Sequence, residues 1–314
     1  MKSLFLPLLL CGLSASAAFA QSLRTEATLA APVPIGTAML CESGTQIIGL
    51  SNDGDIYRWT LPSRTPRKIA TFPDILRIDC AAGKTIAVAL PKGEVLLLDA
   101  ESGAIRQRIE TRERVTNIAL SPDGSLLATT TNITPTRLWD AQTGALISTG
   151  ETNLGAAWSV AFSPDSQVYV SADGDTVIRV YNRKGKLLYT VDGGLEEPFA
   201  VSFRADSKQF AVAGADGVIR LFDTASGKNL KSSATVANPI FGLQMSPDGK
   251  QIAARLLDDF SFKRIAVSLW DPQSSEAKPI STDATKCLGL GTNKSQLLLL
   301  TAETPNSILV SSVQ

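Results

Sequence analysis

The sequence predicts an all-β domain built from seven similar antiparallel units, and three observations support this. A turn tetrad recurs as Ser121-Pro122-Asp123-Gly124, Ser163-Pro164-Asp165-Ser166 and Ser246-Pro247-Asp248-Gly249. Apolar and polar residues alternate on both sides of these turns, which is the pattern of half-buried strands. No segment sustains the spacing of about 3.6 residues that an amphipathic helix requires.

Weaker copies of the tetrad extend the repeat over the rest of the chain. The tetrads begin at positions 41, 80, 121, 163, 204, 246 and 291, with intervals of 39 to 45 residues. An interval of about 40 residues is typical of repeats that each fold as one supersecondary unit. The repeat therefore accounts for nearly all of the chain after its first twenty residues.

Residues 1–20 differ from the repeats and have the pattern of a secretory signal peptide. Lys2 supplies a positive charge, residues 4–13 are almost entirely apolar, and Ala18-Phe19-Ala20 has the small-x-small pattern of a cleavage site. Cys11 would suit a lipoprotein signal, but Leu10 stands where such signals need a small residue. We therefore expect cleavage after Ala20, a mature domain over residues 21–314, and a periplasmic or extracellular location without membrane insertion.

Each unit contains four predicted strands in the same order. The first precedes the tetrad, as in Val115–Leu120, and the second follows it, as in Leu126–Thr130. The third ends in an aromatic residue followed by an acidic one, as in Trp139-Asp140, and a turn then leads into the fourth. Proline presets the backbone of the tetrad and glycine adopts its left-handed position, so each tetrad joins two antiparallel strands tightly.

Four-stranded units at this interval resemble the blades of WD-repeat β-propellers, and bacterial propellers of the YVTN and TolB type share the Ser-Pro-Asp-Gly turn. The resemblance covers essentially the whole mature chain and implies a single seven-bladed β-propeller of four-stranded antiparallel blades. The last unit, from about residue 286, contains only three predicted strands. We expect residues 22–30 to supply an N-terminal strand that completes this blade and closes the ring.

The sequence departs from the family pattern in one respect. WD repeats carry a Gly-His pair whose histidine bonds a turn aspartate, and the aspartate matches at Asp53, Asp175 and Asp216, but the chain contains no histidine. We therefore expect these aspartates to form turns at the solvent, and apolar packing to hold the blades together. The lack of histidine also excludes Ser-His-Asp and Cys-His catalysis and histidine-ligated metal sites.

Composition limits the partners and the covalent chemistry. Lys and Arg together number 30, as do Asp and Glu, so the chain has no basic excess with which to bind nucleic acid. The mature chain has three cysteines, Cys41, Cys80 and Cys287, which allow at most one internal disulfide. The sequence leaves open whether any pair forms, and small buried apolar residues are the default interpretation of each cysteine.

Aromatic residues recur at one position of three consecutive units. Trp158, Phe199 and Phe241 each stand five residues before a tetrad, close to the face on which propellers of this family usually bind. They could fill space between blades, or form an exposed row that anchors a partner. Two neighbouring loops add further candidates. The predicted partner-binding residues are Trp158, Phe199, Phe241, Phe260, Phe262, Glu196 and Glu197.

These observations predict a non-catalytic, exported interaction platform that binds a protein or peptide, with no cofactor and no metal, as a monomer. The alternative is a propeller enzyme, lactonase-like or quinoprotein-like, with its site in the axial channel. Such an enzyme needs polar groups that converge on the axis. The expected inner strands carry mainly small and apolar residues, with Arg77 and Asp79 as the main exceptions, so the platform is favoured.

Overall fold

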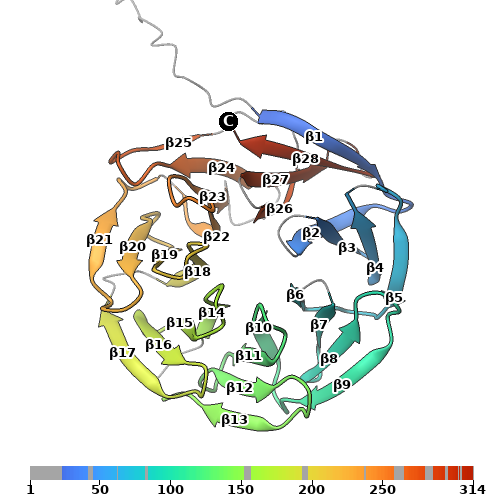
Figure 1. Cartoon of the computed structure of the whole chain (residues 1–314), viewed down its shortest axis with the longest axis horizontal. Coiled ribbons are helices and arrows are strands. Elements are labelled where there is room, and N and C mark those ends of the chain that lie inside the picture. Colours follow the sequence, from blue (N-terminus) through green and yellow to red (C-terminus); the bar gives the residue numbers. More distant parts are fainter. Residues whose placement is uncertain are drawn as a thin grey trace, which may run out of the picture.

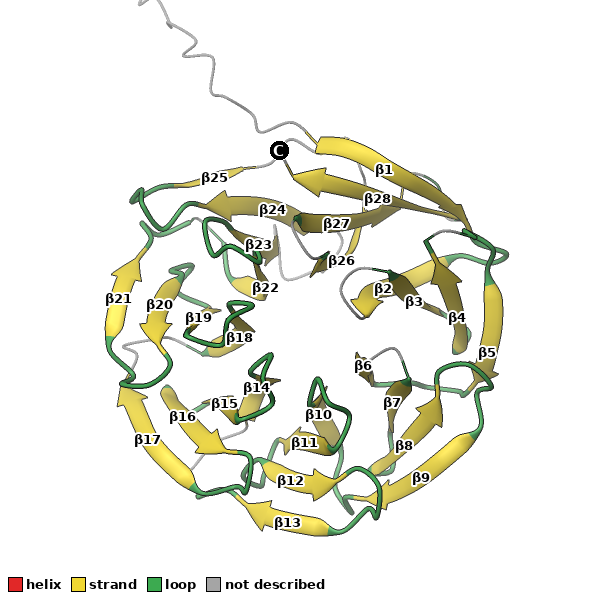
Figure 2. Ribbon diagram, viewed as in Figure 1, coloured by secondary structure: helices red, strands yellow, loops and turns green. Residues whose placement is uncertain are grey.

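The structure is a computed structural model, and it describes residues 23–41, 45–61, 63–81, 84–151, 157–192, 197–236, 238–257, 265–279, 286–293, 296–302, 304 and 306–313. Within these ranges the regular elements are strands β1 to β28, which form seven four-stranded antiparallel sheets. The sheets are arranged as blades around a central axis (Figure 1), and strands and connecting loops make up the whole described ring (Figure 2). The predicted seven-bladed propeller is confirmed. The predicted signal peptide, residues 1–20, lies outside the described residues.

In blades 1 to 6 the four strands follow one another in the chain, from the axis outward. Blade 1 contains β2 (Ile35–Cys41), β3 (Gln46–Ser51), β4 (Asp55–Thr60) and β5 (Arg67–Thr71). Blade 2 contains β6 (Arg77–Ala81), β7 (Thr85–Leu90), β8 (Glu94–Asp99) and β9 (Ile105–Glu110). Blade 3 contains β10 (Val115–Leu120), β11 (Leu126–Thr131), β12 (Arg137–Asp140) and β13 (Leu146–Thr149).

The second half of the ring repeats this order. Blade 4 contains β14 (Ala157–Phe162), β15 (Val168–Asp173), β16 (Val177–Asn182) and β17 (Leu187–Asp192). Blade 5 contains β18 (Pro198–Phe203), β19 (Gln209–Gly214), β20 (Arg220–Asp223) and β21 (Asn229–Ser232). Blade 6 contains β22 (Ile240–Met245), β23 (Ile252–Leu257), β24 (Ile265–Trp270) and β25 (Ala277–Pro279).

Blade 7 joins the two ends of the chain. Its inner strands are β26 (Lys286–Thr292), β27 (Leu297–Ala302) and β28 (Ser307–Val313), and its outer strand is β1 (Leu23–Ala30). β1 runs antiparallel to β28 (Figure 1), and the Trp59 Nε1 of blade 1 donates a hydrogen bond to the carbonyl of Ala30, 3.0 Å away. The predicted N-terminal closure is confirmed, and it leaves no unpaired edge on β28.

The tetrads build the tight turns that their sequence predicts. The Ser121 hydroxyl donates to Asp123 Oδ1 at 2.6 Å, and the same Oδ1 accepts the N–H of Ser125 at 3.0 Å. Blade 4 has Ser166 instead of glycine at the left-handed position (φ 59°). Its hydroxyl accepts the Asp123 N–H of blade 3 at 3.1 Å, so this serine links neighbouring blades.

Apolar packing between neighbouring sheets forms the core. Tyr169 and Tyr181 of blade 4 stack with ring centroids 4.9 Å apart, and they share a buried cluster with residues of blade 3 such as Leu138. Phe210 and Phe222 of blade 5 stack in the same way, at 5.3 Å, against blade 4. Each blade thus contributes an aromatic pair or large aliphatic residues to the space between sheets, as the sequence predicts for interblade packing.

The turn aspartates of blades 4 and 5 do not behave as the sequence suggests. Asp175 accepts hydrogen bonds from Arg179, and Asp216 accepts one from Arg220 at 2.6 Å; both aspartates are partly buried. Both form turns as predicted, since Asp175 accepts the Val177 N–H at 3.2 Å and Asp216 accepts the Val218 N–H at 3.1 Å. The predicted exposure to solvent is wrong, because an arginine four residues along the chain pairs with each carboxylate in place of the missing histidine. Asp53 is exposed, as predicted.

Candidate functional site

Bulges at the start of the inner strands determine which side chains near the axis leave the regular alternation of the strand. In six of the seven blades the first strand pair skips one residue, which is left unpaired. Such a bulge re-aims the side chain of the extra residue away from the regular alternation of the strand. β6 of blade 2 pairs without a bulge. The unpaired residues are Gly36, Thr116, Trp158, Phe199, Phe241 and Leu288.

Three of these bulge residues form a continuous aromatic row, which we define as Trp158, Phe199 and Phe241. The Trp158 and Phe199 rings meet edge to face with centroids 5.7 Å apart, and the Phe199 and Phe241 rings stack at 4.4 Å. The row therefore crosses the inner strands of blades 4, 5 and 6. It lies at the ends where these strands begin, a side of the ring that we call the entry face.

The aromatic row is not part of the interblade core. Trp158 is 38% exposed, and Phe199 and Phe241 are partly buried. None of the three belongs to any of the seven buried clusters of the described residues, whereas Ala157 and Ser159, on either side of Trp158, are buried. The bulge separates these roles, because it leaves Trp158 out of the strand pairing while the two flanking residues are buried.

Polar contacts from blade 3 fix one end of the row. The Asn117 side-chain amide donates to the carbonyl of Trp158 at 3.2 Å, and the Thr116 hydroxyl donates to the carbonyl of Ala157 at 3.2 Å. Both bonds run from β10 to the bulged start of β14. They hold the backbone that carries Trp158, so its ring is presented from a fixed position.

Arg255 lies near the other end of the row, and no sequence motif points to it. It pairs across the sheet with Gly242, the residue after Phe241, and its aliphatic stem occupies the space that a side chain at Gly242 would need. One Nη donates to the carbonyl of Cys287 in blade 7 at 3.4 Å, while the buried Nε has no partner. A cation in this position adds a hydrogen-bond donor between blades 6 and 7.

The other predicted site residues are only partly covered by the described ranges. Glu197 is exposed, with a positive φ of 41°, and its carbonyl accepts the Ala215 N–H at 3.2 Å. It precedes β18 and so stands at the entry face, close in sequence to Phe199. Glu196, Phe260 and Phe262 lie outside the described residues.

A buried ionic cluster supports the entry face of blade 4. The Arg179 side chain is only 2% exposed and contacts Asp173 at 2.5 Å and Asp175 at 2.7 Å. Burial raises the pKa of Asp173, while hydrogen bonds from Ser171 and Arg179 lower it. The cluster joins the ends of β15 and β16 beside the aromatic row, so it serves as a rigid support.

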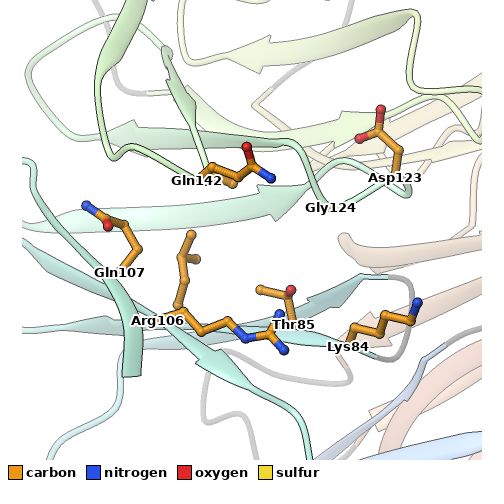
Figure 3. Close-up of a pocket in the computed structure, with 9 residues that line it drawn as sticks. Lys84, Thr85, Arg106, Gln107, Asp123, Gly124 and Gln142 are labelled. Atoms are coloured by element: carbon orange, nitrogen blue, oxygen red, sulfur yellow. The ribbon is translucent and has the colours of Figure 1, made fainter. Parts of the chain in front are cut away.

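A cavity of about 350 Å³ lies on the opposite side of the ring, between the tetrad turns of blades 2 and 3 (Figure 3). Its charged groups are largely compensated, since Arg106 pairs with Asp99 and Asp123 pairs with Arg183 at 3.2 Å. The cavity lies away from the axis, and sequence reasoning did not identify it. Its lining residues are Lys84, Thr85, Leu97, Arg106, Gln107, Asp123, Gly124, Ala141 and Gln142.

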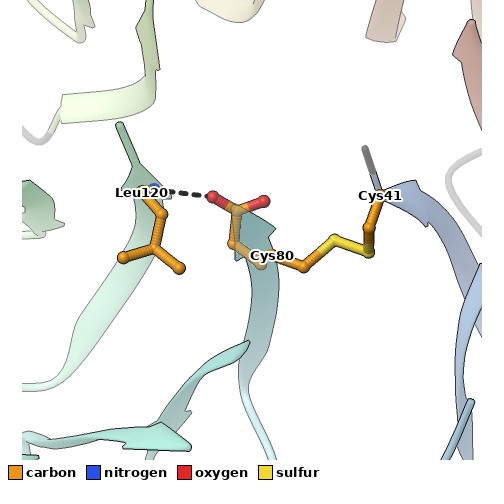
Figure 4. Close-up of a disulfide and its surroundings, with 4 residues drawn as sticks. Cys41, Cys80 and Leu120 are labelled. Atoms are coloured by element: carbon orange, nitrogen blue, oxygen red, sulfur yellow. Dashed lines mark hydrogen bonds between the residues drawn. A yellow bond between two sulfur atoms is a disulfide. The ribbon is translucent and has the colours of Figure 1, made fainter. Parts of the chain in front are cut away.

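One disulfide and one hydrogen bond hold β6 in place near the axis. Cys41 and Cys80, the first residues of the first two tetrads, form a disulfide between blades 1 and 2 (Figure 4), with Cα atoms 5.8 Å apart. The adjacent Asp79 carboxylate accepts the Leu120 N–H of blade 3 at 2.7 Å. Burial raises the pKa of Asp79 to about 6, against the opposing effect of hydrogen bonds from Leu120 and Cys80. Cys287 is a buried free thiol.

Two features are absent from the part of the chain that the structure describes. Among the described residues, no group of three or more cysteine, aspartate or glutamate side chains could hold a metal ion. The same part of the chain has no helix with the length and apolar character needed to cross a bilayer. Near the axis, Asp79 accepts the Leu120 N–H and so links blade 2 to blade 3.

Comparisons with known proteins agree with this architecture. The family model described as "WD domain, G-beta repeat" matches residues 144–182 and 185–223, which run from β13 to β16 and from β17 to β20. Residues 144–182 and 185–223 are thus WD repeats within a seven-bladed β-propeller. The propeller is also similar to a chain in the "Crystal Structure of Mitotic Checkpoint Complex", with a TM-score of 0.76 and 17% identity, covering 100% of this chain and 99% of the other. No curated protein matches it in sequence.

The two matched repeats carry Trp158 and Phe199, so the part of the chain that matches the family model includes two of the three residues of the aromatic row. Each match begins with the outer strand of one blade and ends with the third strand of the next, so the sequence repeat is offset from the structural blade. WD-repeat propellers commonly act as scaffolds that bind proteins. The structural likeness at 17% identity supports the fold alone.

Proposed function

We propose that the protein is an exported, non-catalytic scaffold that captures a protein or peptide partner on its aromatic row. The observation that carries the proposal is the continuous contact of Trp158, Phe199 and Phe241 outside every described core cluster. Rings that fill interblade space, such as Tyr169 and Phe210, are fully buried instead.

The physical basis is the small loss of conformational entropy when rigid aromatic rings bind a partner. Aromatic side chains provide a large contact area and lose little conformational entropy on binding, which is why Trp and Tyr dominate interface hot spots. In the row each ring already contacts its neighbour, and Asn117 fixes the backbone at Trp158. An apolar or aromatic side chain of the partner, laid across blades 4 to 6, is the complementary group.

The disulfide supports the proposed export. Disulfides persist in oxidising compartments such as the periplasm and the cell exterior, and are rare in the cytosol. The Cys41–Cys80 bond therefore agrees with the signal-peptide pattern of residues 1–20. Sequencing the N-terminus of protein purified from its native cells tests this point: we expect the mature chain to start at Gln21, and an intact Met1 would contradict export.

Binding by the aromatic row is tested with matched triple variants. W158A/F199A/F241A removes the row, and I147A/L188A/L230A removes three exposed apolar residues from the outer strands. Both variants should retain the circular dichroism and melting temperature of the parent. We expect partners retained from an envelope fraction by the parent to be retained by the outer-strand variant and lost with the row variant.

Two outcomes would contradict the proposal. If a folded row variant retains the same partners as the parent, the row is not the binding surface. If the row variant alone fails to fold, the three rings are part of the core, and a single W158A substitution at the most exposed ring then separates stability from binding.

A further inference from the structure

Among the described residues, the contacts between blades 1 and 2 differ from those at the other six junctions of the ring. At each of the other six, a hydrogen bond joins described residues of the two neighbouring blades. These bonds are Leu120 N to Asp79, Thr116 Oγ1 to the Ala157 carbonyl, Asp165 N to Ser207 Oγ, Met245 N to Ser202 Oγ, Arg255 to the Cys287 carbonyl, and Thr37 Oγ1 to the Leu288 carbonyl.

At the junction of blades 1 and 2, the described residues form no such bond. Apolar side chains such as Ile48, Ile56 and Val88 fill the space between the sheets. Toward the outside, the two backbones approach closely, since a Cβ on Gly103 would lie 2.1 Å from the carbonyl oxygen of Ile69. Near the axis, where β6 lacks the bulge of its counterparts, the Cys41–Cys80 disulfide is the direct link.

We propose that this disulfide is a site of thiol–disulfide exchange, and that its reduction by an external dithiol opens the inner edge of the junction between blades 1 and 2. Cys80 is partly exposed, whereas Cys41 is 3% exposed. Cys80 is therefore the more exposed residue of the pair, and we expect an incoming thiolate to attack its sulfur, because access largely decides which sulfur is attacked.

The exchange is balanced in two steps. The thiolate of the dithiol attacks Cys80 Sγ, forms a mixed disulfide, and displaces Cys41 as a thiolate that takes a proton from water. The second thiolate of the reductant then attacks the reductant sulfur that is bonded to Cys80 in the mixed disulfide. This attack releases Cys80 as a thiolate, which takes up a proton. The reductant leaves as a cyclic or internal disulfide, having transferred two electrons and two protons to the pair Cys41 and Cys80.

The consequence is local because β6 is held differently on its two sides. Cys80 ties it to blade 1, and the preceding Asp79 ties it to blade 3 through Leu120. Reduction removes only the first link. The other junctions keep their hydrogen bonds, so the loosening is confined to β2 and β6.

Hydrogen exchange of the full mature chain tests the proposal. We compare the oxidised protein, the same protein in dithiothreitol, and the C41S/C80S variant; C287S controls for the free thiol. We expect amides of β2 and β6 to exchange at least ten-fold faster after reduction, with blades 4 to 6 unchanged. Iodoacetamide should then label Cys80 and Cys41 in the folded protein, while Cys287 stays unlabelled.

Three results would overturn the proposal. The first is unchanged exchange after reduction, the second is a uniform increase over all blades, and the third is a disulfide that dithiothreitol reduces only once the protein has unfolded. If C41S/C80S does not fold, the reduced parent protein decides among these outcomes, because it has folded before its disulfide is broken.

Discussion

Replacing Asp79 with asparagine should change how the stability of the protein depends on pH. Burial raises the pKa of Asp79 from 3.8 to about 6, so the folded protein binds this proton more tightly than the unfolded chain. Above pH 6 the carboxylate is ionised in both states and its burial costs stability. As the pH falls from 6 toward 3.8 that cost disappears, because the folded state takes up the proton first.

The size of the effect follows from the two pKa values. Each pKa unit corresponds to about 1.4 kcal/mol, so a rise of roughly two units amounts to about 3 kcal/mol. Asparagine keeps the shape and an acceptor oxygen for the Leu120 N–H but does not ionise. Between pH 7.5 and pH 4 the unfolding free energy of the parent should therefore rise by about 2.5 kcal/mol relative to that of D79N, which is most of the full effect, because pH 4 lies just above the unfolded pKa of 3.8.

Urea unfolding followed by tryptophan fluorescence at several pH values measures this difference. Asp99 provides the control, since hydrogen bonds from Ser102 lower its pKa to about 2. The stabilising contribution of Asp99 is lost only as the pH falls below 3.8. The unfolding free energy of D99N should therefore change with pH in parallel with that of the parent from pH 7.5 to pH 4.5. The reasoning is refuted if the D79N and parent curves are also parallel over this range.

Two further predictions concern the links that hold the ring. Under non-reducing conditions, C41S/C80S should lower the unfolding free energy by about 4 kcal/mol, because the bond closes a loop between residues 39 apart; a loss below about 1 kcal/mol in urea unfolding would show that the bond adds little. R179M should cost about 3–5 kcal/mol, because it leaves Asp173 and Asp175 partly buried without their cation. R220M breaks a more exposed pair and should cost less by the same assay, and equal losses would contradict this account.

The local repeats could be read from the sequence because strands and tight turns depend on neighbouring residues. The segment Val115–Leu120 was expected as a strand and is β10 with the same bounds, and the expected strand Leu126–Thr130 differs from β11 by one residue. Alternation of apolar residues specifies a strand face, and the Ser-Pro-Asp-Gly chemistry specifies its turn. The number of blades follows from the interval between turns, and the N-terminal closure follows from a last unit that contains only three predicted strands.

The bulges were not predictable, because a bulge depends on the register between two strands and not on either strand alone. Trp158, Phe199 and Phe241 were identified as a recurring position, but the sequence left open whether they face the core. In blade 7 the position five residues before the tetrad is Lys286, whereas the bulge residue is Leu288. The expected tetrad at Gly291 is misplaced, because Gly291 and Thr292 pair with β27 inside β26 and the turn begins only at Asn293.

The all-β class and the position of the aromatic residues could be predicted from patterns within about ten residues, and the number of units from the 39 to 45 residues between successive turns. Only the tertiary structure decided that Cys41 meets Cys80, that Arg179 replaces the missing histidine as partner of Asp175, and that Arg255 reaches blade 7. These contacts depend on how the closed ring sets one sheet against the next. Such distances between blades are fixed by the packing of whole sheets, which no local pattern encodes.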